Sequence, residues 1–144
     1  MAEIKEFATK ARKVVKEFAD KSNLFTPHLG GLCGISSFLL KKISDEKNIN
    51  STVICGHYNG LDGHLWLKVH LDNDYIVDIT ETQFQNPNST TYSPVSIYES
   101  PHNRYWENEL KVEYNIFSHW PEDRRPTPLI VEELYKEYLK ELVA

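Results

Sequence analysis

The sequence predicts an α+β fold, because helix-like and strand-like stretches occupy separate parts of the chain. Apolar residues recur at three- and four-residue intervals near both ends and again over 33–46, which is typical of amphipathic helices. Between residues 51 and 80, three β-rich stretches follow one another without an intervening helix, which favours an antiparallel sheet. A chain of 144 residues has the length of one domain, so we expect 1–144 to form a single domain.

Two helices are predicted before the strands. The first covers about residues 3–20 and carries an apolar stripe of Ile4, Phe7, Ala8, Ala11, Val14, Val15 and Phe18. The segment "KSNLFTPHLGG" then breaks the pattern with a proline and two glycines. A second stripe, Ile35, Phe38, Leu39 and Ile43, predicts a helix from about 33 to 46. This second helix begins at Cys33.

Three strands are predicted next, at 51–58, 64–71 and 74–80, with a turn at "NGLDG" between the first two. On the middle strand Leu65, Leu67, Val69 and Leu71 share the face that we expect in the core, and His64, Trp66, Lys68 and His70 share the other. Short strands are expected at "PVSIYE" and "KVEYNIF". A C-terminal helix is expected from the cap Thr127 and the stripe Leu134, Tyr135, Tyr138, Leu139 and Leu142.

The charge of the chain argues against two classes of partner. A net charge of −5 does not suit nucleic acid or an anionic membrane surface, both of which are held by clustered lysine and arginine.

The N-terminus lacks the apolar core of a secretory signal and no run is long enough to cross a bilayer, so we expect a cytoplasmic protein. In that compartment Cys33 and Cys55 are expected to be reduced.

Cys33 has the position of an activated thiol. At the first turn of a helix, the positive end of the helix dipole and the unpaired backbone N–H groups favour thiolate over thiol. The preceding glycines allow close backbone approach, and N–H groups near the sulfur can bind a developing oxyanion. On this feature alone, however, the sequence favours a buried structural cysteine, because free cysteine is among the most buried residue types.

A nucleophilic thiol needs a base and a group that orients the base. His64 and Asp78 are the candidates, and they share a face only in one register of the hairpin. A two-residue turn would place Asp78 on the leucine face, away from His64. A three-residue loop at 71–73 would make paired residue numbers sum to 144, with Trp66 opposite Asp78 and His64 diagonal to it. The hypothesis therefore predicts an odd-length loop or a bulge.

The wording "GLCGISSFLLKK", "GHLWLKV" and "YIVDIT" over about residues 30–84 resembles the transglutaminase-like branch of the papain-like superfamily. The resemblance implies a cysteine-headed helix packed on an antiparallel sheet, with flanking N- and C-terminal helices. It implies that Cys33 is the nucleophile, His64 the general base and acid, and Asp78 the residue that orients His64. "GLCG" lacks the tryptophan that commonly follows the cysteine in that family, and no glutamine stands a few residues upstream.

Such a triad carries out acyl transfer on an amide through a thioester, so we expect a specific peptidase or deamidase acting on a protein or peptide. A transglutaminase or N-acyltransferase is the enzymatic alternative, and a non-catalytic binding module on the same fold is the other. Trp66, Gln83, His28 and Gly31 are candidate cleft residues. We expect no cofactor and no metal, since the histidines and cysteines show no paired ligand spacing. The polar segment 85–106 is expected to cover the cleft.

Overall fold

The computed structural model describes residues 1–22, 31–85, 92–108 and 112–143. It shows an α+β fold with three α-helices and a five-stranded antiparallel sheet among these residues. The helices are α1 (Ala2–Lys21), α2 (Cys33–Glu46) and α3 (Pro128–Val143). The strands are β1 (Ser51–Tyr58), β2 (Leu61–His70), β3 (Asp74–Asp78), β4 (Ser96–Glu99) and β5 (Tyr105–Glu107), in the spatial order β4-β3-β2-β1-β5.

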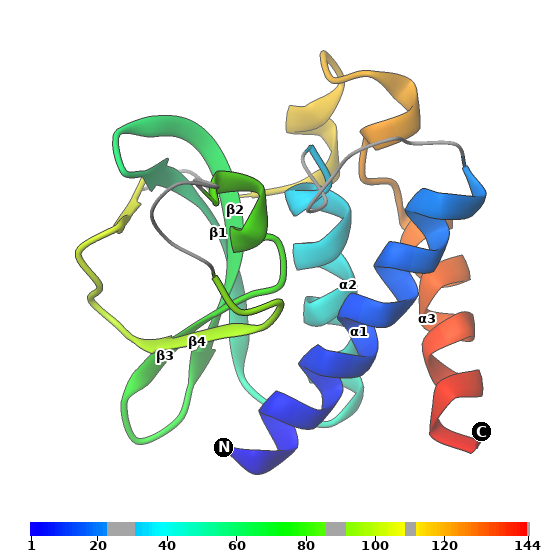
Figure 1. The fold of residues 1–144 in the computed structure, drawn as a ribbon, viewed down its shortest axis with the longest axis horizontal. Coiled ribbons are helices and arrows are strands. Elements are labelled where there is room, and N and C mark those ends of the chain that lie inside the picture. Colours follow the sequence, from blue (N-terminus) through cyan, green and yellow to red (C-terminus); the bar gives the residue numbers. More distant parts are fainter. Residues whose placement is uncertain (23–30, 86–91, 109–111, 144) are drawn as a thin grey trace.

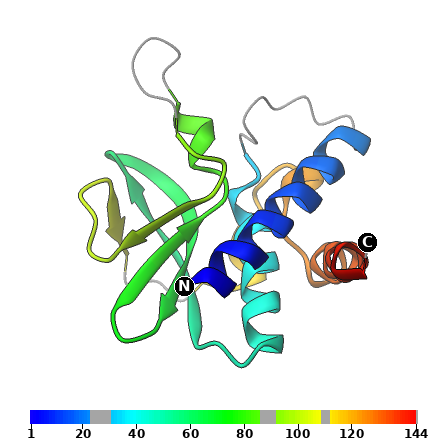
Figure 2. The same cartoon turned by 60° about the horizontal axis from the view of Figure 1, so that its bottom comes forward.

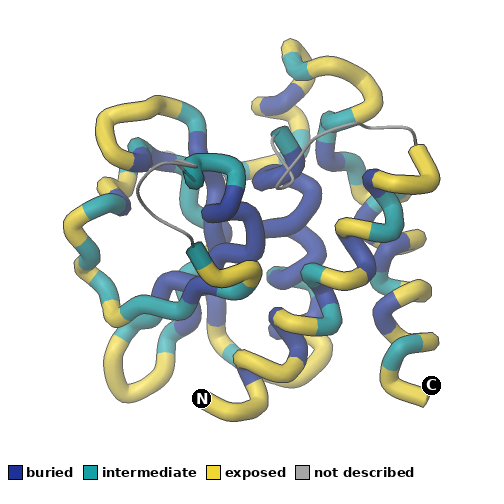
Figure 3. Tube along the Cα trace, in the orientation of Figure 1, coloured by how far each residue is buried: buried dark blue, intermediate teal, exposed yellow. Residues whose placement is uncertain are grey.

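The helices form a layer on one side of the curled sheet (Figures 1 and 2). α2 packs directly on β1 and β2, while α1 and α3 both pack on α2. The tube of α2 is accordingly buried along most of its length (Figure 3). The apolar stripe of α1 and the leucine face of β2 meet α2 in one core cluster. Both helix predictions in the first third of the chain are thus confirmed to within a residue.

Turn geometry sets the register of β1, β2 and β3. Asn59 and Gly60 have φ of 48° and 82°, and they form a two-residue loop that pairs Tyr58 with Leu61. A β-bulge follows, because Gly63, with φ 84°, is skipped in the pairing. Between β2 and β3, Lys68 pairs with Ile76 and His70 with Asp74, which confirms the three-residue loop at 71–73. β3 ends at Asp78 rather than at residue 80.

A second, smaller core lies on the face of the sheet opposite α2. It is formed by Tyr58, Trp66, Ile76 and Tyr105. The chain leaves β4 at one edge of the sheet and returns in β5 at the other edge, so residues 100–104 connect the two edges. Trp66 is fully buried there, and the prediction that it lines the Cys33 cleft is wrong.

The second half of the chain differs from expectation in two places. β4 lies within "PVSIYE" as predicted, but Tyr114–Phe117 is a 3-10 helix and not a strand, and β5 has no counterpart in the prediction. α3 begins as predicted, since the Thr127 hydroxyl accepts a hydrogen bond from the Ile130 N–H at 3.2 Å. Leu139 and Leu142 of its stripe are exposed. In the part of the chain that the structure describes, no helix has the length and apolar character to span a bilayer.

Candidate active site

Cys33 is the first residue of α2 and is 5% exposed. Its N-cap, Leu32, makes no side-chain capping bond among the described residues, and the first α-helical hydrogen bond there joins the Ser36 N–H to the Leu32 carbonyl at 3.0 Å. The helix therefore starts with N–H groups that have no partner within the helix. Cys33 therefore stands at the end of α2 that carries the positive pole of the helix dipole.

His64 and Asp78 form a buried pair on the face of the sheet opposite the leucines. His64 Nε2 lies 2.7 Å from Asp78 Oδ2, and both side chains are 1% exposed. The confirmed register brings the two residues to diagonal positions on adjacent strands. The bulge directly before His64 bends β2 and increases its twist at this end.

Asp78 accepts more hydrogen bonds than the one from His64. The Tyr105 hydroxyl donates to Oδ2 at 2.8 Å, and the Thr80 N–H donates to Oδ1 at 2.8 Å. The bond from Thr80 turns the chain and ends β3. Tyr105 was not a candidate from sequence, because β5 is only three residues long and has no alternating pattern.

Each member of the His64–Asp78 pair stabilises the charged form of the other. Burial by itself lowers the pKa of His64, but the charge and hydrogen bond of Asp78, with a smaller contribution from Cys33, raise it to about 10. Burial raises the pKa of Asp78, but the charge and hydrogen bond of His64 outweigh it and hold that pKa below its ordinary value. His64 is therefore an imidazolium at neutral pH. Four aromatic rings surround it, those of Tyr58, Trp66, Phe84 and Tyr105.

Cys33 and His64 line one pocket of about 320 Å³. Nδ1 of His64 is buried and makes no hydrogen bond of normal geometry within the described ranges, yet the Cys33 side chain is near enough to affect the pKa of the ring. Loose contacts of this kind are common in sites without substrate. The pocket also contains two of the predicted cleft residues, Gly31 and Gln83. His28, the other cleft candidate, lies outside the described residues.

Gln83 joins the two sides of the pocket. Its side-chain oxygen accepts a hydrogen bond from the Gly31 N–H at 3.3 Å, and its side-chain nitrogen donates to the Thr80 hydroxyl at 3.3 Å. It thereby links the turn before Cys33 to the segment after Asp78. Gln83 thus connects the two chain segments that carry Cys33 and Asp78.

The outer wall of the pocket comes from a part of the chain that was not predicted to form it. Trp120, Pro121 and Arg124 line it, in the segment that precedes α3. The prediction that 85–106 covers the cleft is wrong for residues 92–106, which do not line this pocket and instead form the edge strand β4 and the connection over the face of the sheet opposite α2. Residues 86–91 lie outside the described part of the chain.

A buried carboxylate, Glu81, supports the segment after Asp78. Glu81 is fully buried and accepts hydrogen bonds from the hydroxyls of Tyr58, Ser96 and Tyr98 at 2.6, 2.7 and 2.5 Å. Arg104 Nε completes the set at 3.0 Å. These four partners compensate for the cost of burying the charge. The sequence signal for Glu81 was weak, because its partners lie in two different strands, β1 and β4, and in the loop before β5.

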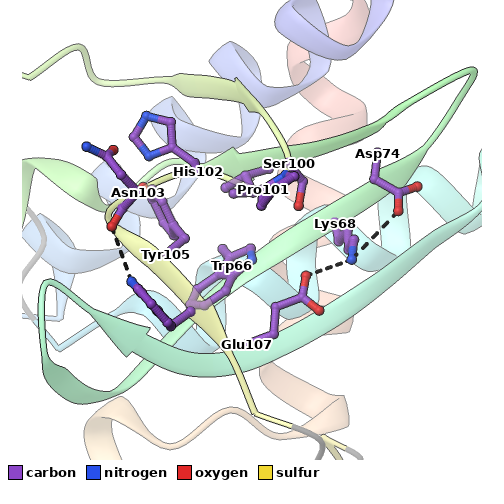
Figure 4. Close-up of a pocket in the computed structure, with 11 residues that line it drawn as sticks. Trp66, Lys68, Asp74, Ser100, Pro101, His102, Asn103, Tyr105 and Glu107 are labelled. Carbon is purple, nitrogen blue, oxygen red and sulfur yellow. Dashed lines mark hydrogen bonds and ion pairs between the residues drawn. The ribbon is translucent and has the colours of Figure 1, made fainter.

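A larger pocket, of about 590 Å³, lies on the face of the sheet opposite α2, beneath residues 100–103 (Figure 4). Lys68 there lies between two carboxylates, 2.7 Å from Glu107 and 3.7 Å from Asp74. Neither Cys33 nor His64 lines this pocket. Within the described ranges, no group of three or more His, Cys, Asp or Glu residues is arranged to hold a metal ion. No family model, curated protein or solved structure matches the chain.

The raised pKa of His64 predicts a stability loss at alkaline pH. Because this pKa is above the ordinary 6.5, the stabilising contribution is complete below about pH 6.5 and is lost as pH rises through about 10. The lowered pKa of Asp78 acts in the opposite direction, so its contribution is lost only in acid. Urea unfolding at pH 6, 8 and 9.5 should show that the free energy of unfolding of the wild type exceeds that of His64→Gln by less and less as pH rises. A constant difference between the two proteins over this range would contradict the pKa shift.

Proposed function

We propose that the chain is a cysteine-dependent acyl-transfer enzyme that acts on an amide, as a specific peptidase or deamidase. The observation that carries the proposal is the buried His64–Asp78 pair in the same pocket as a cysteine at a helix N-terminus. The resemblance of the sequence motifs to those of the transglutaminase-like family supports the same assignment. The order of the cysteine helix, histidine strand and aspartate strand along the chain also agrees with it.

In the proposed reaction, the Cys33 sulfur attacks the amide carbonyl carbon and forms a tetrahedral intermediate. Backbone N–H groups at the start of α2 stabilise the oxyanion. When the C–N bond breaks, the His64 imidazolium gives its proton to the leaving amine, and a thioester remains on Cys33. Neutral His64 then takes a proton from water as water attacks the thioester, which releases the acid and regenerates the thiolate–imidazolium pair. Asp78 holds the ring in place throughout.

The nucleophile is tested by alkylation with iodoacetamide at pH 6. Cys33 should react far faster than a free cysteine peptide, of which less than about 1% is ionised at that pH. Cys55 provides an internal reference, because it is half-buried on β1 and burial raises its pKa. Peptide mapping after short exposure should find label on Cys33 and almost none on Cys55. Labelling of Cys33 no faster than the free peptide would instead indicate the non-catalytic binding module.

The acyl-transfer step needs its own experiment. After brief exposure to p-nitrophenyl acetate, intact mass should show one acetyl group, mapped to Cys33 and removed by hydroxylamine as expected for a thioester. Cys33→Ser, which keeps the size of the side chain but replaces the sulfur, should remain unlabelled. Stable acetylation elsewhere, with none on Cys33, would contradict the proposal.

A further inference from the structure

Arg124 places a positive charge beside the backbone that leads into Cys33. It ends the 3-10 helix Glu122–Arg124 and lines the pocket of Cys33 and His64. Its side chain packs over Gly31, where a β-carbon would lie 3.0 Å from Cδ and 3.5 Å from both Nε and Nη1. Gly31 has φ 79°, a conformation that suits glycine, and stands two residues before the nucleophile.

The guanidinium of Arg124 has no carboxylate partner in the described part of the chain. Among the described residues no carboxylate forms an ion pair with it, and its Nε is buried without a hydrogen-bond partner. The adjacent Arg125 also has a buried Nε without a partner among the described residues, but its Nη2 donates to the Trp120 carbonyl at 2.8 Å. A guanidinium has five N–H donors in a fixed plane, and donors left without acceptors in a pocket wall favour a ligand that supplies them.

In the pocket wall as the structure describes it, no other group is placed to pair with the Arg124 guanidinium. The pocket's carboxylate, Asp62, is 76% exposed and lies 3.8 Å from His57. The other walls are mostly apolar, formed by Leu61, Phe84, Trp120 and Pro121. An anionic group entering the pocket therefore finds a cation in the same pocket as the thiol, with apolar surface around it. A poorly hydrated surrounding strengthens such a pairing.

We propose that Arg124 is a specificity residue that binds a carboxylate of the substrate, next to the amide that Cys33 attacks. The assignment rests on the proposed acyl-transfer function and narrows it to substrates with an acidic group beside the scissile amide. That carboxylate belongs either to the C-terminus of a peptide or to an aspartate or glutamate side chain. Both sources offer the same planar pair of oxygens to the guanidinium.

Two alkylating reagents of nearly equal size test the assignment. Iodoacetate carries a carboxylate and iodoacetamide a neutral amide, and both alkylate Cys33 with loss of iodide. Arg124→Gln should lower the rate with iodoacetate about tenfold, the effect of losing one charge-assisted hydrogen bond, and change the iodoacetamide rate less than about twofold. Arg124→Lys should retain part of the preference. Lys140→Gln removes the same charge from an exposed site on α3 and should change neither rate.

The outcomes separate the two proposals. If iodoacetamide labels Cys33 quickly but Arg124→Gln leaves the ratio of the two rates unchanged, the Arg124 assignment is wrong and the acyl-transfer proposal stands. If neither reagent labels Cys33 faster than a free cysteine peptide, both fall. N-iodoacetylglycine and the α-amide of N-iodoacetylaspartate then distinguish the terminal carboxylate from the side-chain one. The reagent whose rate depends on Arg124 identifies the source, and dependence of neither overturns the assignment.

Discussion

Replacing His64 by alanine should slow the alkylation of Cys33 by iodoacetamide about 100-fold at pH 6. Under the proposed mechanism, the His64 imidazolium, held by Asp78, activates the sulfur. Without it, Cys33 has only the helix N-terminus to activate it. The difference between variant and wild type should shrink by pH 9, where ordinary thiols are largely ionised. Rates are measured by mass spectrometry of the Cys33 peptide.

His70 offers a matched control on the same strand and the same face. Its Nδ1 lies 2.8 Å from Asp74, so it too is a histidine paired with a carboxylate, but it is remote from the pocket. His70→Ala should leave the Cys33 rate unchanged. Asp78→Asn keeps the shape of the pair, removes its negative charge, and should give a rate between those of the wild type and His64→Ala. A rate for His64→Ala within threefold of the wild type at pH 6 would refute the role given to His64.

Glu81→Ala should reduce the free energy of unfolding by about 3–5 kcal/mol, as is typical when one partner of a buried ion pair is removed. The substitution leaves Arg104 without its carboxylate and three hydroxyl groups without their acceptor. It also releases the segment that follows Asp78. Urea denaturation monitored by circular dichroism at pH 7 gives the change.

Two further variants show whether the effect comes from the buried charge. Glu137→Ala removes an exposed glutamate that is paired with Lys140, and it should change stability by less than about 0.5 kcal/mol. Adding Arg104→Met to Glu81→Gln should recover part of the loss caused by Glu81→Gln alone, because no unpaired charge then remains. A loss below about 1 kcal/mol for Glu81→Ala would show that Glu81 is not the centre of this cluster.

The sequence predicted those parts of the site that depend on local patterns. The start of α2 at Cys33 follows from a glycine break and a helical apolar stripe, and the diagonal placement of His64 and Asp78 follows from strand alternation and one loop length. Both are short-range properties with a period that can be counted. The distance between Cys33 and the pair could not be counted in this way, because it depends on how α2 packs on the sheet.

The residues that the sequence analysis missed lie in parts of the chain without a periodic pattern of apolar residues. Tyr105 lies on a three-residue strand, and Arg124 on a single 3-10 turn. Each reaches the site through a long-range contact that the neighbouring sequence does not predict. The error over 92–106 has a related cause: the prediction assumed that a segment directly following the aspartate strand would fold over the cleft. Instead β4 pairs with β3, and the chain then crosses the face of the sheet opposite α2.

The loop at 71–73 has a consequence for how this chain can change its length. Its residues are exposed, and exposed loop tips are where insertions and deletions are usually tolerated. Here a gain or loss that the loop itself absorbs leaves the pairs from His70–Asp74 to Leu67–Val77 unchanged, whereas a one-residue slip of β3 against β2 would move Asp78 to the leucine face. Viable relatives with the same pair should therefore differ in the length of this loop while keeping the register of the two strands, or carry a compensating bulge in one of them.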